Sequence, residues 1–153
     1  MPRTVTLEEM HGLVGQELSP SAWKVIGQDR IDQFADVTED WQFIHIDPDK
    51  AKDTPFGTTI AHGFLSLSML SALVPDDYPM PDDVAMGVNY GFDKIRFIQP
   101  VASGSKIRSR MKLLAFEERV PKQYQSRWDV TVEIEGQSKP ALKAEWLTLV
   151  FVN

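Results

Sequence analysis

The residues best suited to chemistry in this chain are a carboxylate and an imidazole on one short segment. Asp40 and His45 lie in the segment Asp-Trp-Gln-Phe-Ile-His, and Ala61-His62-Gly63 follows further along the chain. A carboxylate and an imidazole held this close can bind one water between them and move its protons. Gly63 opens an apolar run that suits a helix, whose first N–H groups are free to face a substrate oxygen. Together these residues indicate addition of water to a polarised double bond, or the reverse elimination.

That reaction needs a base for the water, an acid for the α-carbon and a donor to the enolate-like oxygen. Neutral His45 is a competent base near pH 7, and Asp40 is expected to position the water and handle the α-proton, although the two roles can be exchanged. Trp41, Phe43 and Ile44 are expected to form apolar surroundings that favour a protonated Asp40. The N–H of the helix-opening glycine would stabilise the oxyanion.

Each of these residues also has an ordinary structural interpretation. Asp40 and His45 could be a helix cap and a surface histidine, and Gly63 could serve packing alone. His62 is expected to be a structural side chain at the helix start rather than a direct catalyst. Ser71 is expected to bond to its own helix backbone rather than orient Asp40.

Two other kinds of site are disfavoured by spacing. Asp40, His45, Asp47 and His62 lack the tight spacing of metal ligands, so we expect no metal. No Gly-x-Ser-x-Gly segment is present, which argues against a serine hydrolase. The chain has no cysteine, which excludes disulfides and a cysteine nucleophile and fits a cytoplasmic protein.

Composition places the chain among globular proteins of one domain, residues 1–153. Hydrophobic residues make up 42% and charged residues 25% of the sequence. The net charge of −6 argues against nucleic acid or an anionic membrane as the main partner. No apolar run follows Met1-Pro2-Arg3, so we expect no signal peptide, and the apolar stretch from Gly63 to Val74 is shorter than the ~20 residues that span a bilayer.

Helical patterns dominate the first half of the chain and alternating patterns the second. Helices are expected after the capping-box pair of Thr6 and Glu9, over residues 29–37, after Asp47-Pro48, and over residues 62–74. The last of these is apolar on almost every side, which predicts a buried helix. Strands are expected at residues 23–26, 84–88, 94–97, 106–113, 125–134 and 142–151. This order predicts an α+β domain in which a curved antiparallel sheet wraps around one long buried helix.

These elements and motifs resemble the hotdog-fold MaoC-like hydratases, also called (R)-specific enoyl-CoA hydratases or hydratase 2, and their NodN-like branch in particular. The resemblance rests on Asp40 to His45, Pro55 to Gly63, Asn89-Tyr90-Gly91 and Arg96-Phe97, and it covers nearly the whole chain. The chain departs from the commoner hydratase 2 loop, because Gln42-Phe43 stands where that loop has Asn-Pro.

The resemblance implies a homodimer that acts on an acyl thioester of coenzyme A or of a carrier protein. The implied reaction is reversible syn hydration of a trans-2-enoyl thioester to the (R)-3-hydroxyacyl thioester, with no metal or redox cofactor. Asp40, His45 and Gly63 are the expected catalytic residues. The substrate would contact Gln42, Phe56, Gly57, His62, Phe64, Asn89 and Tyr90.

Three questions stay open at this point. A hotdog thioesterase and a non-catalytic acyl-thioester-binding or partner subunit are the alternatives to a hydratase, because one fold hosts several functions. Asn89 and Tyr90 either line the acyl pocket or form a turn. The alternating cations Lys106, Arg108, Arg110 and Lys112 either meet coenzyme A phosphates or form a solvated sheet face.

Overall fold

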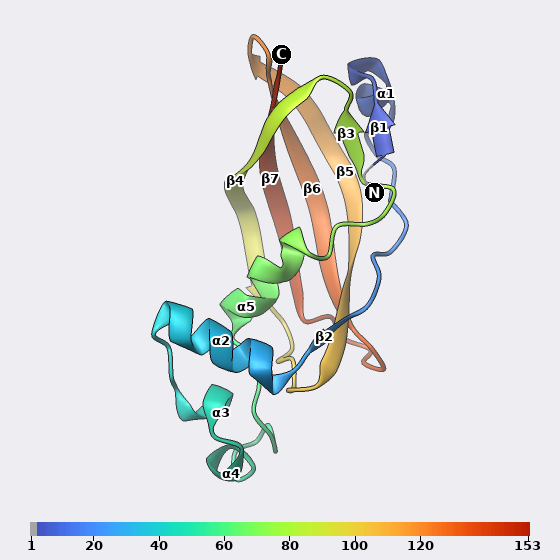
Figure 1. Ribbon diagram of the computed structural model, residues 1–153. Coiled ribbons are helices and arrows are strands. Elements are labelled where there is room, and N and C mark those ends of the chain that lie inside the picture. The colour runs from blue at the N-terminus through green and yellow to red at the C-terminus, as the bar shows by residue number, and fades with distance from the viewer. Residues whose placement is uncertain (1–2) are drawn as a thin grey trace.

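The computed structural model, which describes residues 3–153, is a curled antiparallel sheet with most of its helices gathered toward one end and a short N-terminal helix near the other (Figure 1). Met1 and Pro2, on which part of the signal-peptide expectation rests, lie outside the described residues. The elements in chain order are β1 (Arg3–Val5), α1 (Leu7–Gly12), β2 (Lys24–Ile26), α2 (Gln28–Thr38), α3 (Phe43–Ile46), α4 (Pro48–Ala51), α5 (Gly63–Ser68), the 3₁₀ helix η1 (Met69–Ser71), β3 (Pro79–Pro81), β4 (Val84–Phe97), β5 (Ser105–Val120), β6 (Gln123–Ile134) and β7 (Leu142–Val152). The predicted α+β architecture is confirmed.

The main sheet has the strand order β2-β5-β6-β7-β4, and a small parallel pair of β1 and β3 lies beside it. The predicted alternation holds: Ile107, Met111, Trp128, Val130 and Val132 point inward and are almost fully buried. They share one hydrophobic core with apolar residues of α5 and η1, which lie against the concave face of the sheet (Figure 1). The strand periodicity therefore decides which face of the sheet the helix covers.

One prediction about the sheet is wrong. Residues 84–88 and 94–97 are not two strands around a turn at Asn89-Tyr90-Gly91, because β4 runs unbroken from Val84 to Phe97. Its pairing with β7 shifts register at three places, one of them between Asn89 and Gly91. These irregularities bend the strand, so a local signal for a turn becomes a bend within a long strand.

The central helix is shorter and more exposed than predicted. Regular α-helix ends at Ser68, and a 3₁₀ turn carries the chain on to Ser71 instead of Val74. Pro75 disfavours helical geometry at Val74, so the helix does not reach its predicted end. Leu65 and Leu70 are buried, but Phe64 is 69% exposed, so one face of the helix is uncovered in a single chain.

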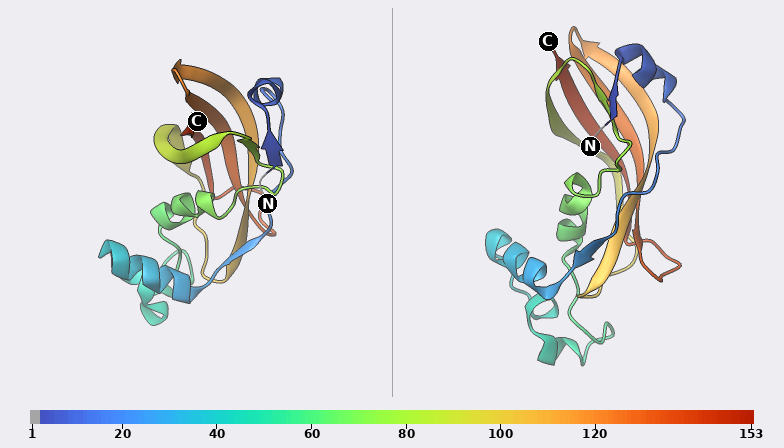
Figure 2. Two further views of the ribbon diagram at one scale, coloured as in Figure 1. Left: turned by 45° about the horizontal axis from the view of Figure 1, so that its top comes forward. Right: turned by 45° about the vertical axis from the view of Figure 1, so that its right-hand side comes forward.

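Helices α2, α3 and α4 lie at the end of the molecule where α5 begins, and α1 lies near the opposite end (Figure 1). The Thr6–Glu9 capping box opens α1 as predicted, and Asp47 caps α4 with Pro48 at its first position. Helices α2, α3 and α4 lie close together beyond the end of the sheet in both views of Figure 2. None of the helices within residues 3–153 is long and apolar enough to cross a membrane.

Candidate active site

Asp40 owes its position to the way α2 ends. Glu39 adopts the left-handed conformation, with a φ of 58°, and stops the helix. The Asp40 N–H then donates to the Ala35 carbonyl at 3.1 Å, which fixes the first residue of the loop. The Asp40 side chain therefore leaves α2 at the point where the chain turns toward α3.

His45 lies on α3 and is buried, with 7% of its surface exposed. Its Nδ1 is 2.7 Å from the Ile60 carbonyl oxygen, which can only accept, so Nδ1 carries the proton and donates. The Nε2 of the neutral ring is therefore left with a free lone pair. The Ile60 N–H in turn donates to the Ile44 carbonyl at 3.0 Å, so α3 and the segment before α5 hold each other in place.

Gln28 of α2 is a further support of this arrangement that the sequence did not reveal. Its side-chain Nε2 donates to the His45 carbonyl at 2.6 Å, and its Oε1 accepts from the buried Thr59 hydroxyl. One amide therefore connects α2, α3 and the segment before α5. Because the residues are far apart in sequence, no local pattern could have predicted the contact.

His62 serves the structural role expected of it. Its Nε2 lies 3.0 Å from the Asp40 backbone oxygen and donates to it, which ties the Asp40 loop to the start of α5. Its ring stacks on His45 with 3.8 Å between the centroids and contacts Phe34 at 5.0 Å. His62 thus supports both members of the proposed catalytic pair.

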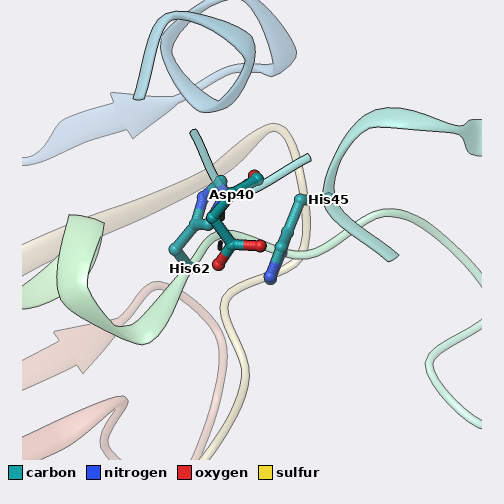
Figure 3. Close-up of side chains that lie close together, drawn as sticks. All are labelled: Asp40, His45 and His62. Atoms are coloured by element: carbon teal, nitrogen blue, oxygen red, sulfur yellow. Dashed lines mark hydrogen bonds and ion pairs between the residues drawn. The ribbon is translucent and has the colours of Figure 1, made fainter. Parts of the chain in front are cut away.

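Asp40 and His45 lie close together as the sequence spacing indicated, and His62 joins them, which the spacing did not indicate. One nitrogen or carboxylate oxygen from each of Asp40, His45 and His62 lies within 4.8 Å of those of the other two. In Figure 3 the Asp40 carboxylate points toward the two imidazole rings. A water that makes two hydrogen bonds of about 2.8 Å bridges a gap of this size, so the carboxylate and His45 can share one water.

The same cluster is poorly arranged for a metal ion. The His45 and His62 rings are stacked, with an interplanar angle of 24°, and each uses one nitrogen in a hydrogen bond to a backbone oxygen. A metal binds in the plane of an imidazole at about 2.0 Å, and two stacked planes cannot both contain one ion. Asp47 points elsewhere, because its carboxylate caps α4 at the Lys50 N–H.

Burial favours the neutral, basic form of His45. Loss of hydration on burial lowers the pKa of His45 below 6.5, and the hydrogen bond with the Ile60 carbonyl opposes this shift. Nearby His62 also lowers the pKa, whereas the Asp40 carboxylate raises it. The net lowering keeps His45 unprotonated at neutral pH, as a general base requires.

The surroundings of Asp40 differ from the prediction. Its side chain is 53% exposed, Trp41 is 53% exposed and Phe43 is 41% exposed, so a single chain has no closed apolar pocket around the carboxyl group. The Trp41 indole N–H donates to the Asp36 carboxylate at 2.9 Å, which draws the ring away from the site. Any desolvation of Asp40 must come from substrate or from a second chain.

A cavity of about 330 Å³, called here the catalytic cavity, opens beside His45. Phe56 and Gly63, both predicted, line it. Gly63 is the first residue of α5, so its N–H has no partner within the helix. A side chain at Gly63 would place its Cβ 3.1 Å from the Phe97 ring, which shows how closely the two approach. The predicted base and the predicted oxyanion donor therefore share one cavity.

The other predicted substrate contacts do not line the catalytic cavity in a single chain. Gln42 precedes α3, and Gly57 lies in a turn with a φ of 69°. Phe64 points outward and packs edge-on against Phe97. Asn89 lines a different cavity together with Ser71, and Tyr90 is 60% exposed on β4.

Several residues of the catalytic cavity were missed. Ser66 is one helical turn after Gly63, a spacing that could have revealed it. The rest of that wall comes from the end of β4, the connection from β4 to β5 and the residue before β7, which no local pattern links to the site. These residues are Phe97, Ile98, Gln99, Pro100, Val101 and Ala141.

Comparisons with known proteins give one consistent result. A family model described as a MaoC like domain matches residues 9–134. Nodulation protein N from Rhizobium leguminosarum bv. viciae is 44% identical over 147 residues, which are 95% of this chain and 91% of that protein. The 3-hydroxyacyl-thioester dehydratase Z of Mycobacterium tuberculosis (strain ATCC 25618 / H37Rv) is 39% identical over 140 residues, 92% of each chain.

A third relative carries a stereochemical name. The (R)-specific enoyl-CoA hydratase of Aeromonas caviae is 30% identical over 108 residues, 71% of this chain and 75% of that protein. A solved structure of an (R)-hydratase from A. caviae superposes with a TM-score of 0.70 at 24% identity, covering 88% of this chain and 94% of that one. The expected hotdog fold and the resemblance to the NodN-like branch are confirmed.

Proposed function

The chain belongs to the MaoC-like domain family, and from that premise we propose that it catalyses the reversible (R)-specific hydration of trans-2-enoyl thioesters. The observation that carries the proposal is the neutral, buried His45 with a free Nε2, beside Asp40 and in the same cavity as the Gly63 N–H. The names of the mycobacterial and Aeromonas relatives, a 3-hydroxyacyl-thioester dehydratase and an enoyl-CoA hydratase, support this reaction and its substrate class.

In the forward reaction His45 Nε2 takes a proton from the bridging water as the water oxygen bonds to the β-carbon. The electron pair of the double bond moves toward the thioester carbonyl, whose oxygen the Gly63 N–H stabilises. Asp40 gives a proton to the α-carbon, which completes the addition of one water. Asp40 must enter this step protonated, and the proton on His45 then passes through solvent to the Asp40 carboxylate, which restores both groups. No metal takes part in this scheme.

A homodimer is part of the proposal. Within residues 3–153, β4 pairs on one side only, with β7, and forms a long free edge of the sheet. Exposed apolar side chains gather on and near that edge: Phe64, Met86, Val88, Tyr90 and Phe97. A long apolar edge is stable in water only when covered, and a second copy of β4 and α5 would cover it. The partner would also close the space around Asp40.

A thioesterase would hydrolyse the thioester bond and release free thiol, whereas a hydratase adds water to the double bond. One assay on the same substrate therefore separates the two reactions. Purified protein is incubated with crotonyl-CoA, and both the enoyl absorbance and the free thiol are followed. The proposal requires loss of enoyl absorbance without thiol release, and formation of the (R)-3-hydroxy product. Thiol release at the rate of substrate loss would establish a thioesterase. Tight binding without either reaction would establish a non-catalytic subunit, a possibility that the name of nodulation protein N leaves unaddressed.

A further inference from the structure

The catalytic cavity continues toward the outer face of the sheet. A smaller hollow of about 250 Å³ shares Phe56, Ile60, Gln99 and Pro100 with the catalytic cavity. That hollow shares Ile134 and Gln137 with an outer cavity of about 550 Å³, which lies across β5, β6 and the loop before β7. The shared walls place the three spaces in one row that begins at His45.

The outer cavity carries more positive charge than its ion pairs neutralise. Five cationic and three anionic side chains line it, although the whole chain has a net charge of −6. Arg108 and Arg110 both bond to Glu133, at 2.7 and 2.6 Å, and Arg110 also pairs with Glu17. Partial burial raises the pKa of Glu133, but the hydrogen bonds from the two arginines outweigh it and hold this pKa below its ordinary value.

Of the four cations that the strand pattern indicated, only Lys112 takes part in no ion pair among the described residues. Lys106 pairs with Glu135, and the two arginines are occupied, so for these three the solvated sheet face is the better interpretation. Three lysines that line the outer cavity take part in no ion pair in the described part of the chain. They are Lys112 of β5, Lys139 of the loop before β7 and Lys143 of β7. Two carboxylates lie beside Lys112: Asp129, opposite it in the strand register, and Glu17, opposite it at an isolated bridge and paired with Arg110.

Two side-chain amides line the middle hollow, between the catalytic cavity and the outer cavity. The Gln99 side chain donates to the Gln137 side chain at 2.9 Å, and both residues line the middle hollow. An amide-rich ligand can exchange that mutual bond for bonds to its own N–H and C=O groups. The order of surfaces from His45 outward is thus apolar, then amide, then cationic.

Resting on the proposed thioester function, we propose that Lys112, Lys139 and Lys143 bind the phosphates of the nucleotide end of coenzyme A. An acyl-CoA presents the same order of groups: an apolar acyl chain, an amide-containing arm and a phosphorylated nucleotide. The volume of the outer cavity lies in the range of small-molecule sites, whereas a folded carrier protein cannot enter it. Lysine ammonium groups attract phosphate as point charges and need no fixed orientation.

The test compares a triple variant, Lys112→Gln/Lys139→Gln/Lys143→Gln, with a matched control, Arg119→Gln. Arg119 is an exposed residue of the same strand as Lys112, and it lies outside all three spaces. We expect the triple variant to raise KM for crotonyl-CoA about 10-fold, because each exposed charge contact contributes a factor of about two to five. Its kcat, and its KM for crotonyl-pantetheine, which lacks the nucleotide, should stay within about two-fold.

Direct binding separates this proposal from the catalytic one. Adenosine 3′,5′-bisphosphate is titrated by calorimetry into the wild type, both variants above and His45→Ala. Binding that weakens about 10-fold in the triple variant alone supports the site, even when no protein shows turnover. Equal binding in the triple variant and in the wild type would overturn it. So would a rise in KM that is the same for crotonyl-pantetheine as for crotonyl-CoA.

Discussion

Replacement of Gly63 by alanine tests whether the start of α5 is where the thioester carbonyl binds. The added Cβ would lie 3.1, 3.2 and 3.3 Å from three atoms of the Phe97 ring, so the ring must move by a few tenths of an ångström. Phe97 is 49% exposed in a single chain, so its ring has room to shift there. Alanine also suits a helix better than glycine by up to about 1 kcal/mol, so the free energy of unfolding should change by less than about 1 kcal/mol.

Activity should respond much more strongly than stability. The methyl group occupies the side of the cavity from which the carbonyl must approach the Gly63 N–H, and a misplacement on the order of 1 Å costs about 100-fold in rate. We therefore expect kcat/KM for crotonyl-CoA to fall about 100-fold, while urea denaturation shows nearly wild-type stability. Gly12→Ala is the matched control, because a Cβ at Gly12 meets no atom within 4 Å.

A second substitution distinguishes the two ways in which the methyl group could act. Phe97→Leu in the Gly63→Ala background removes the crowded ring atoms but leaves the methyl group beside the N–H. Activity that stays low in the double variant identifies the carbonyl position as the cause, and activity that returns identifies the ring. Wild-type kcat/KM in the Gly63→Ala variant would refute the placement of the oxyanion donor at this helix.

Three further results are expected. The lowered pKa of His45 predicts that protonation of this base reduces kcat/KM only below pH 6.5. Because the unfolded state binds the extra proton more readily in that range, the free energy of unfolding should also decrease from pH 6.5 down to the folded-state pKa. ¹⁵N NMR should show the neutral ring protonated at Nδ1. A pH-independent unfolding free energy in this range, or protonation at Nε2, would contradict this. Phe64→Glu places a charge on the exposed apolar edge and should shift the protein from dimer to monomer in light scattering, with loss of activity; an active monomer would exclude a need for the partner. Gln28→Leu leaves the Thr59 hydroxyl and the His45 carbonyl without their partner, which should lower the unfolding free energy by about 2 kcal/mol in urea titrations and reduce kcat without raising KM, whereas unchanged values of both would remove its positioning role.

Sequence reasoning succeeded where a feature depends on neighbours along the chain. The Thr6 capping box, the Asp47 cap and the alternation of β5 and β6 all follow from local spacing, and all are present. The convergence of Asp40 and His45 was also readable, because Asp40 lies on the short connection that leads directly into α3, where His45 lies.

Sequence reasoning failed where contacts between distant segments decide the outcome. Phe64 is exposed because nothing in a single chain covers its face of α5. Asn89 and Tyr90 become strand residues of the continuous β4 because pairing with β7 overrides the local turn signal. The four alternating cations of β5 look equivalent in the sequence. In the structure, three of them form ion pairs with carboxylates on β6 and in the loop after it. Such pairings carry no local signature.

The pairing of Asp40 and His45 on one water is the central claim, and a double-mutant cycle tests it most directly. Hydration of crotonyl-CoA is measured for the wild type, Asp40→Asn, His45→Ala and the variant carrying both changes. If the two groups act on the same water, each single change should lower kcat by at least about 100-fold, and the double change should cost little more than either alone. Independent losses that multiply in the double variant, or a single variant with nearly wild-type kcat, would contradict a shared water at this site.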